Sequence, residues 1–459
     1  MKLNSQLLKL VYRMIPMLFF MIAFVSIIPS TMAEGFQACH RVVLSKKDIT
    51  QENKSIVRTW KANTLLDSVN VELENLTQHY VEKLAPNLQE ALNKTTRNSR
   101  MDVVIRYSRT GLTWLSFLVQ ARVTYHRALV HQEVASRTYD MVTGFPISLA
   151  DLFDEDSLGW DMLGEAVREQ ATAYFPDDVP NAQAMAQLSS ASGLKNLAFT
   201  LHGMSLVLHI PAEMLYPETH SLIEVTIMYP ALRAHMTERA QEETDNLTYY
   251  QTCALTFDDG PSRTNTSLVL NSLLKNGTHA TFFIIGNRIA DADDIVMRTH
   301  DEGHTIGAHN WHHGNVSKSS AASLCKMVEK FDTALIECIG IPSRYNRVPY
   351  GLYPSMVKAE VGWPLIQWSL DTYDWRERTS SQVLATVKDQ ISDGDIILCH
   401  DIKGNAPKST ERIIAYLEEA GYLLLSIDEL FAKDDITLKE DIVYYRCTNG
   451  VTNRKEDER

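Results

Sequence analysis

The chain has 459 residues, of which 45% are hydrophobic and 8% aromatic, with 20 Gly and 15 Pro. This is the composition of an ordinary globular protein, and it excludes collagen-like, low-complexity and wholly disordered chains. The formal net charge is −13. Because phosphate binding needs clustered Lys and Arg, and no basic stripe is present, nucleic acid is excluded as a partner. The length predicts two or three domains.

Residues 1–33 have the features of an export signal. Lys2, Lys9 and Arg13 precede an uncharged stretch that ends in small residues suited to a signal peptidase. Its apolar part, 14–28, is short for a bilayer-spanning helix, which needs about 20 residues. A cleaved signal peptide is therefore favoured over an uncleaved signal anchor, which would be the only membrane attachment. Both predict an exported protein: periplasmic, associated with the cell wall, or extracellular.

Six cysteines follow the signal region, and their spacing fits no zinc motif. They are Cys39, Cys253, Cys325, Cys338, Cys399 and Cys447. An oxidising compartment permits Cys325–Cys338 or Cys39–Cys447 bridges, and buried free thiols are the equal alternative.

A polar segment at 233–251 separates two regions with different patterns, and we expect it to be a linker. Residues 40–232 combine a long helical stretch at 69–94 with strand-like segments such as 114–125 and helical ones such as 182–188. No cluster of His, Cys or acidic residues stands out there. We therefore expect a non-catalytic extracellular α+β module.

Residues 252–432 alternate short apolar segments with helical ones, which predicts parallel strands joined by helical crossovers. Strands are expected at 254–257, 280–285, 305–308, 365–369, 396–399 and 423–427. A barrel and an open sheet both fit the alternation. Asp and His side chains follow directly after several strands, as they do at the active face of a β/α barrel. Residues 433–459 are predicted to be a C-terminal tail, in which the charged run at 453–459 is solvated.

Two motifs carry a metal-site pattern. The sequence Thr-Phe-Asp-Asp-Gly-Pro at 256–261 ends the first strand of this region. Adjacent acids at a strand-to-turn junction can both reach one cavity, although such a turn is more often only a turn. His-Asn-Trp-His-His at 309–313 places His309 and His313 four residues apart, which one helical turn brings to a common face. Two histidines and one carboxylate are a usual catalytic zinc set.

Three further motifs follow: Arg-Val-Pro-Tyr-Gly at 347–351, Asp-Thr-Tyr-Asp-Trp at 371–375 and Leu-Cys-His-Asp at 398–401. In order and spacing the five motifs resemble the NodB-type polysaccharide deacetylases, carbohydrate esterase family 4, across about residues 252–430. The resemblance implies an α/β fold, a distorted (β/α) barrel of the NodB type, preceded by a smaller α+β domain. The first half resembles more loosely the module that precedes some bacterial peptidoglycan deacetylases.

The resemblance implies a metal-assisted reaction. Asp259, His309 and His313 would hold one divalent ion, zinc in the first place, with cobalt, nickel or manganese as alternatives. Asp258 would be the general base that takes a proton from water. Arg347 would pair with Asp258 and keep it ionised and oriented.

The resemblance also implies a proton donor. His400 would be the general acid that protonates the leaving amine. Asp374, and as a further candidate Asp371, would keep the imidazole charged and in position. Cys399 should face away from the site, because its strand neighbours Leu398 and His400 point inward.

The resemblance further implies three residues that contact the substrate. The backbone N–H of Tyr350 would stabilise the oxyanion, so Tyr350 is both a catalytic and a substrate-binding candidate. Trp375 and Leu398 would shape the apolar pocket for the acetyl methyl group. Asn310 and Val348 stand where the family usually has other residues, but neither removes a ligand or a proton carrier.

Together with the export signal, the resemblance implies an exported, metal-dependent hydrolase of non-peptide amide bonds that removes N-acetyl groups from amino sugars. The expected substrate is a polysaccharide, peptidoglycan in the first place, through its GlcNAc or MurNAc units. An O-acetyl esterase acting on xylan, or a deacetylase of chitin oligomers, is the first alternative. An inactive wall-binding protein is the second, and the complete set of motif residues disfavours it.

Overall fold

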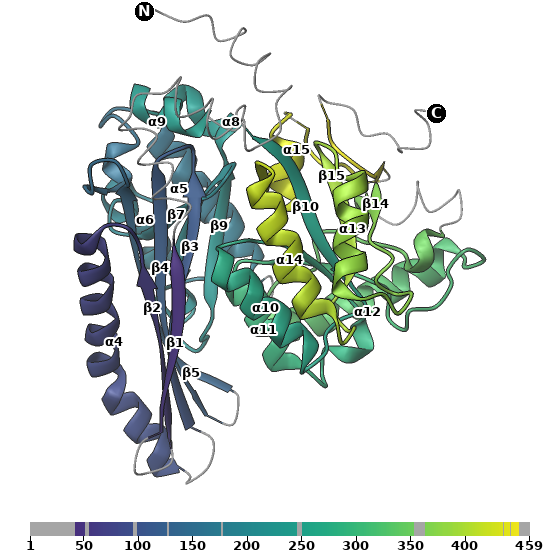
Figure 1. Ribbon diagram of the computed structural model, residues 1–459. Coiled ribbons are helices and arrows are strands. Elements are labelled where there is room, and N and C mark those ends of the chain that lie inside the picture. Colours follow the sequence, from purple (N-terminus) through teal and green to yellow (C-terminus); the bar gives the residue numbers. More distant parts are fainter. Residues whose placement is uncertain are drawn as a thin grey trace, which may run out of the picture. The chain divides into compact units, whose positions relative to one another are not determined.

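The computed structural model describes residues 42–50, 55–94, 99–125, 128–175, 178–245, 250–352, 363–434, 436–440 and 442–448. Apart from the short segment 275–277, the described residues up to 245 form one compact unit and those from 250 form another. Figure 1 shows the elements of both units. The predicted signal at 1–33 and Cys39 lie outside the described residues. Among the described helices, none has the length and apolarity that a membrane crossing requires.

The N-terminal unit contains a six-stranded sheet in the order β1-β2-β3-β4-β5-β6. Its strands are β1 (Val43–Thr50), β2 (Ile56–Asn63), β3 (Ser99–Thr110), β4 (Trp114–Tyr125), β5 (Ala128–Asp140) and β6 (Pro146–Ile147). Helix α4 (Asp67–Lys94) joins β2 to β3, the one parallel pair of this sheet. It lies along one face of the sheet in Figure 1, and its buried residues, which include Val69, Leu73 and Tyr80, recur at helical spacing.

A second, three-stranded antiparallel sheet completes this unit. It consists of β7 (Ala198–Leu201), β8 (Ser205–Pro211) and β9 (Leu222–Met228). The helices of this part are α5 (Gly159–Ala173), α6 (Ala182–Leu188), α7 (Ala191–Leu194) and α8 (Tyr229–Leu232). The predicted mixture of helices and strands in a separate first domain is confirmed.

The predicted linker at 233–251 is folded over most of its length. Helix α9 (Glu238–Thr244) lies within it and belongs to the N-terminal unit. The carboxylate of Glu243 is buried, where it accepts hydrogen bonds from the backbone N–H of Leu112 (3.1 Å) and the hydroxyl of Thr113 (2.8 Å). The polar composition of the segment predicts a linker, whereas in the structure one of its acids is buried and satisfied by hydrogen bonds.

The C-terminal unit is built on parallel strands in the order β12-β11-β10-β15-β14, with β16 paired to the start of β10. The strands are β10 (Gln251–Asp258), β11 (Thr281–Ile284), β12 (Thr305–Ala308), β14 (Leu370–Asp371), β15 (Asp395–His400) and β16 (Tyr422–Leu424). A parallel pair, β13 (Leu365–Ile366) with β17 (Val443–Tyr444), lies beside them. Asn346 bridges to Ala308 on one side and to Leu365 on the other, which links β12 to β13. The chain then runs from β13 to β14, so the strands follow a distorted barrel, as predicted.

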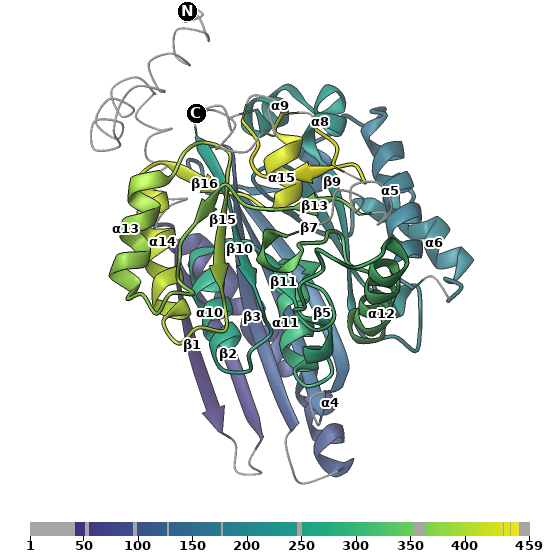
Figure 2. The same cartoon turned by 90° about the vertical axis from the view of Figure 1, so that its right-hand side faces the viewer.

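Both faces of these strands are buried, which explains their continuous apolar sequences. Phe257, Phe282 and Ile397 pack with apolar side chains of the surrounding helices. Phe283 and Ile396 belong to a second cluster on the opposite face. The helices are α10 (Asn265–Asn276), α11 (Asp293–Asp301), α12 (Ala321–Ile339), α13 (Ser380–Gln390), α14 (Ala406–Glu419) and α15 (Ile427–Ala432). Figure 2 shows α13 and α14 to one side of β15, β10 and β11, and α12 to the other.

The part of the predicted C-terminal tail that the structure describes, up to residue 448, is packed against the C-terminal unit, whereas the run at 453–459 lies outside the described residues. Tyr444 is 2% exposed, and its ring packs edge-on against Phe431 with the centroids 5.0 Å apart. The buried Cys447 follows it and donates its backbone N–H to the carbonyl of Gly394 (2.9 Å). The predicted boundary at 432 is therefore wrong: the fold extends to residue 448, because a two-residue strand is too short to produce a periodic pattern.

The five cysteines of the described residues are free thiols. Of the two alternatives for Cys325 and Cys338, the structure thus shows the unpaired one. Cys399 packs among the helices that cover the sheet, facing away from the side of the strand that Leu398 occupies, as predicted.

Candidate metal and active site

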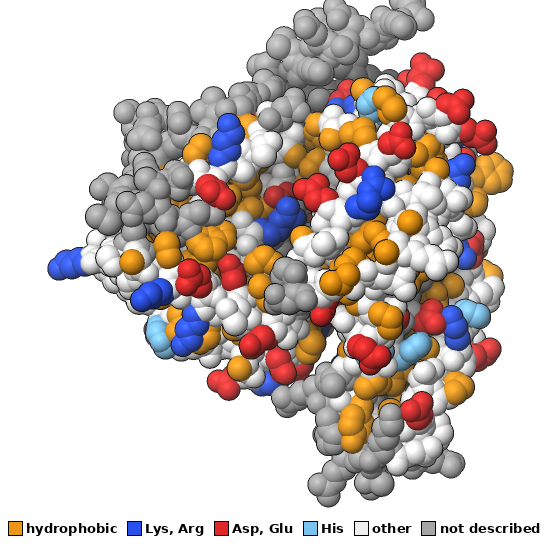
Figure 3. Space-filling model, turned by 180° about the vertical axis from the view of Figure 1, so that it is seen from behind, with side chains coloured by type: hydrophobic (Ala, Val, Ile, Leu, Met, Phe, Trp, Pro, Cys, Tyr) orange, Lys and Arg blue, Asp and Glu red, His pale blue; other side chains and the backbone are white. Residues whose placement is uncertain are grey.

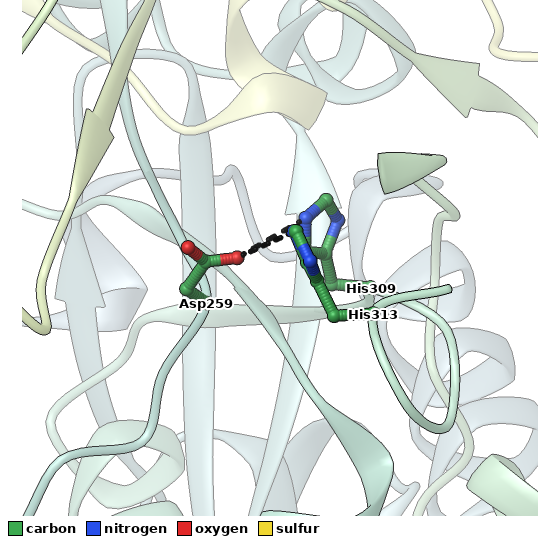
Figure 4. A group of neighbouring side chains, drawn as sticks. All are labelled: Asp259, His309 and His313. Carbon is green, nitrogen blue, oxygen red and sulfur yellow. Dashed lines mark ion pairs between the residues drawn. The ribbon is translucent and has the colours of Figure 1, made fainter. Parts of the chain in front are cut away.

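The three predicted metal ligands meet at the carboxyl ends of β10 and β12. Nε2 of His313 lies 2.9 Å from Oδ1 of Asp259, and Nε2 of His309 lies 3.5 Å from the same oxygen. The three ligand atoms are all within 4.8 Å of one another, and Figure 4 shows Asp259 facing both imidazole rings. Two histidines and one carboxylate form the donor set of many catalytic zinc sites.

Backbone contacts fix the orientation of His309. Its Nδ1 lies 2.7 Å from the carbonyl oxygen of Arg347. Because a carbonyl only accepts, Nδ1 carries the hydrogen and the lone pair of Nε2 is directed at Asp259. Burial lowers the pKa of His309, although the charges of Asp258 and Asp259 act in the opposite direction. A neutral imidazole whose Nδ1–H donates to a carbonyl is the form that binds a metal ion through Nε2.

Asp259 is held ionised. Burial raises its pKa, but a hydrogen bond from His313 and the charges of both histidines outweigh burial and lower the pKa to about 2. The deprotonated carboxylate and the neutral imidazole are the protonation states that metal coordination requires.

Asp258, the predicted base, occupies a different environment. Its Oδ1 accepts a hydrogen bond from Nη1 of Arg347 at 2.7 Å, and its Oδ2 lies 3.7 Å from Nε2 of His309. Arg347 is fully buried and also donates to Thr256 Oγ1 (2.8 Å) and to the carbonyl of Ile366 (3.0 Å). Its guanidinium carbon lies 4.0 Å from the centre of the Phe283 ring. A buried cation with satisfied donors thus fixes the carboxylate of Asp258.

His400, the predicted acid, lies beside the predicted base. Asp258 and His400 are register partners on the neighbouring parallel strands β10 and β15. Nδ1 of His400 is 2.7 Å from Oδ1 of Asp374, and the backbone N–H of His400 donates to Oδ2 of Asp374 (2.8 Å). Burial lowers the pKa of His400, but the hydrogen bond and the charge of Asp374 outweigh it and raise the pKa to about 9.

Asp371 does not share this role with Asp374. Its carboxylate accepts hydrogen bonds from the backbone N–H of Tyr373 (2.7 Å) and from Nε1 of Trp375 (3.2 Å). Burial raises its pKa. The structure therefore selects Asp374 as the partner of His400 and makes Asp371 the residue that holds the loop after β14.

The predicted substrate-contacting residues lie around the same strand ends. The ring of Tyr350 is 61% exposed and packs edge-on against His313, with the centroids 4.9 Å apart. Trp375 is 43% exposed, whereas Leu398 is buried on β15. An exposed aromatic rim and a buried aliphatic residue fit the predicted contacts with a sugar and an acetyl group.

All non-glycine residues with positive φ in the described part of the chain lie in the loops of this site. They are Asp259, Asn310, His313, Tyr350, Tyr373 and Glu377, with φ between 51° and 77°. Such a conformation costs an L-residue roughly 1–2 kcal/mol, and it concentrates where function constrains the backbone.

Sequence reasoning missed one buried acid of the site. Asp401, next to His400, is fully buried and accepts a hydrogen bond from the hydroxyl of Thr266. Burial raises its pKa to about 7. A Cβ on Gly260 would lie 2.4 Å from Oδ2 of Asp401, so only glycine fits between this carboxylate and the Asp258–Asp259 turn. The position of Asp401 in the motif, directly after His400, was the feature of the sequence that could have identified it.

Known proteins are similar to this region of the chain. A family model for polysaccharide deacetylases matches residues 247–362. The peptidoglycan-N-acetylglucosamine deacetylase PgdA of Listeria monocytogenes is 37% identical over 180 residues, which are 39% of this chain and 39% of that protein. A peptidoglycan-N-acetylglucosamine deacetylase of Bacillus cereus is 30% identical over 185 residues, 39% of this chain and 67% of the relative. The chain belongs to the polysaccharide deacetylase family.

Polysaccharide deacetylases are hydrolases of N-acetyl groups, and this chain has the fold of the family. A further relative, the peptidoglycan-N-acetylmuramic acid deacetylase PdaC of Bacillus subtilis, is 31% identical over 177 residues, 39% of this chain and 38% of the relative. The match thus spans about two fifths of the Listeria and B. subtilis proteins. The family model ends at 362, so the loop at 371–375 and the strand end at 398–401 lie beyond it.

Proposed function

We propose that the chain is an exported, metal-dependent deacetylase that hydrolyses the N-acetyl groups of amino sugars in peptidoglycan. The observation that carries this proposal is the convergence of a two-histidine, one-carboxylate cluster with a base candidate paired to arginine and an acid candidate paired to carboxylate. Export rests on the signal-like sequence at 1–33, and peptidoglycan on what the relatives' names say of those proteins.

Asp259, His309 and His313 fit a divalent ion of the zinc type. An ionised carboxylate and a neutral imidazole with its Nδ1 committed to a carbonyl are suitable donors. A metal bound there would polarise the acetyl carbonyl and make water more acidic.

Asp258 accepts the proton of the attacking water. Arg347 holds its Oδ1, which leaves Oδ2, on the side of His309, as the atom that takes the proton. Because Arg347 is fixed by backbone carbonyls, the carboxylate keeps this orientation without reorganising during the reaction.

His400 donates the proton that the leaving amine needs. Asp374 occupies its Nδ1, so Nε2 carries the proton toward the substrate. A pKa of about 9 keeps the imidazole protonated at neutral pH. The backbone N–H of Tyr350 stabilises the negative charge that develops on the carbonyl oxygen.

Acetate release from purified full-length protein tests the proposal. Zinc-loaded protein should release acetate from peptidoglycan glycan strands, and chelator-treated protein should lose activity and regain it with added metal. Mass spectrometry of the products should show the loss of one acetyl group per modified amino sugar. Release from O-acetylated xylan but not from amino sugars would assign the chain to esterases instead, and inactivity on all of these substrates would refute a hydrolytic function.

A further inference from the structure

The loop after β14 presents an arginine stacked on two aromatic rings. The guanidinium carbon of Arg376 lies 4.8 Å from the centre of the Tyr373 ring and 4.5 Å from that of Trp375. The two ring centroids are 6.3 Å apart. The backbone N–H of Arg376 donates to the carbonyl of Tyr373 (3.1 Å), which closes the turn. Stacking on aromatic faces holds a guanidinium in place while its edge N–H groups stay available.

Those N–H groups have no acceptor among the described residues. Arg376 is exposed and forms neither an ion pair nor a side-chain hydrogen bond there. The nearby Arg378 differs, because its Nη1 donates to Thr386 Oγ1 at 2.7 Å. Arg376 is therefore a positioned cation whose hydrogen-bonding capacity the protein does not use.

The same loop forms part of the proposed active site. Arg376 follows Asp374 by two residues, and Asp374 binds the His400 imidazole at 2.7 Å. Two residues of chain span at most about 7 Å. Arg376 thus lies close in the chain to the proposed active site, and a group that it bound would be part of the same glycan substrate.

We propose that Arg376 binds a carboxylate of the substrate and selects glycans whose sugars carry acidic substituents over neutral amino-sugar polymers. This inference rests on the proposed function and names its substrate class. The guanidinium edge matches the two oxygens of a carboxylate. The surrounding site is rich in acids, among them Asp258, Asp259, Asp371 and Asp374, so an anionic substrate needs a cation at this rim. The carboxylate is either that of a lactyl ether on the sugar or that of a peptide attached to it.

Three substrates and three variants of the full-length protein separate these cases. The substrates are a neutral oligomer of N-acetylglucosamine, a peptide-free peptidoglycan oligomer with free lactyl carboxylates, and the same oligomer carrying stem peptides. The variants are Arg376→Gln, Arg376→Lys and, as a charge-matched control, Lys408→Gln on the exposed face of α14.

Arg376→Gln should lower kcat/KM on the carboxylate-bearing oligomers by roughly 10–100-fold, mainly through KM, because a charge-assisted bidentate contact is lost. Arg376→Lys should show a smaller decrease in kcat/KM on these oligomers, and Lys408→Gln should show no decrease. Activity on the neutral oligomer should change less than twofold. If Arg376→Gln loses more kcat/KM on the peptide-free oligomer, Arg376 binds the lactyl carboxylate. If it loses more on the peptide-bearing oligomer, Arg376 binds a carboxylate of the peptide.

Equal losses on neutral and acidic oligomers, or no loss on the acidic ones, would overturn the inference while leaving the proposed function intact. Wild-type protein that is inactive on every oligomer would instead refute the proposed function.

Discussion

Asp258 and Asp259 are neighbours in the chain, yet one faces Arg347 and the other faces two imidazoles. Asp258→Asn should therefore keep stoichiometric metal and lower turnover by roughly 10²–10⁴-fold, because an amide cannot take the proton. Asp259→Asn should instead lose metal. Metal analysis of the purified variants, together with acetate release, checks both.

Thermal unfolding is the necessary control for Asp258→Asn, since Arg347 is fully buried beside it and a buried charge without its partner destabilises a protein. The amide oxygen can still accept from Arg347, so we expect a folded variant. An exchange of the two phenotypes would show that the base and the ligand are reversed.

The charge of His400 predicts a pH dependence. The rate should be constant around neutral pH and fall as pH rises through about 9, where the imidazole loses its proton. Removing the carboxylate charge in Asp374→Asn removes the interaction that raises the pKa, so the alkaline limb should move downward. Rates measured from pH 5 to 10, on either side of the ordinary His value of about 6.5, locate this limb.

An activated acetate ester serves as the control substrate for His400→Ala. A good leaving group needs no protonation, so the ester should lose less rate than the amide. Equal losses would contradict the general-acid assignment, and an alkaline limb unmoved in Asp374→Asn would contradict the pairing.

At the scale of elements, long periodic segments were predictable and short irregular ones were not. The segments predicted at 114–125, 182–188 and 305–308 agree with β4, α6 and β12. The strand expected at 365–369 is only Leu365–Ile366, since the chain changes partners between β13 and β14. A two-residue ladder leaves no periodicity for a sequence pattern to reveal.

The same distinction applies to the site. The convergence of the candidate ligands and proton carriers was predictable, because their motifs lie at or just after strand ends, and parallel strand ends converge. The stacking of Arg376 on Tyr373 and Trp375 was not, because it occurs in an irregular loop in which Tyr373 and Glu377 have left-handed backbone conformations. No periodicity encodes such a loop.

The strand β17 gives a prediction of stability. Tyr444→Ala should lower the free energy of unfolding by about 3 kcal/mol, because it removes a buried ring that packs against Phe431. Ile442→Ala is the matched control: its side chain is 40% exposed, and the expected change is within about 0.5 kcal/mol. Denaturant unfolding measures both, and equal effects would contradict a buried role for β17.

At the scale of the whole molecule, charge and the location of chemistry were the predictable features. On the face shown in Figure 3, Lys and Arg side chains are interspersed with Asp and Glu, in agreement with the absence of a basic stripe in the sequence. Within the described residues, the one group of three or more His, Cys or acidic residues arranged for a metal is Asp259, His309 and His313, in the C-terminal unit. No such group is found among the described residues of the N-terminal unit, and its sequence pattern predicts a fold but no chemistry.

The left-handed residues of the site loops constrain how this enzyme can diversify. At Asn310, Tyr373 and Glu377 the backbone conformation, rather than a ligand or a proton, limits which side chains are accepted. Glycine, asparagine and aspartate tolerate it, and valine, isoleucine and threonine do not. These positions lie in the loops where new substrate contacts would arise. Few amino-acid types are accepted there, so few mutations at these positions can change the substrate specificity. Adaptation to a new glycan is easier at positions such as Arg376, whose own φ is not among the positive ones.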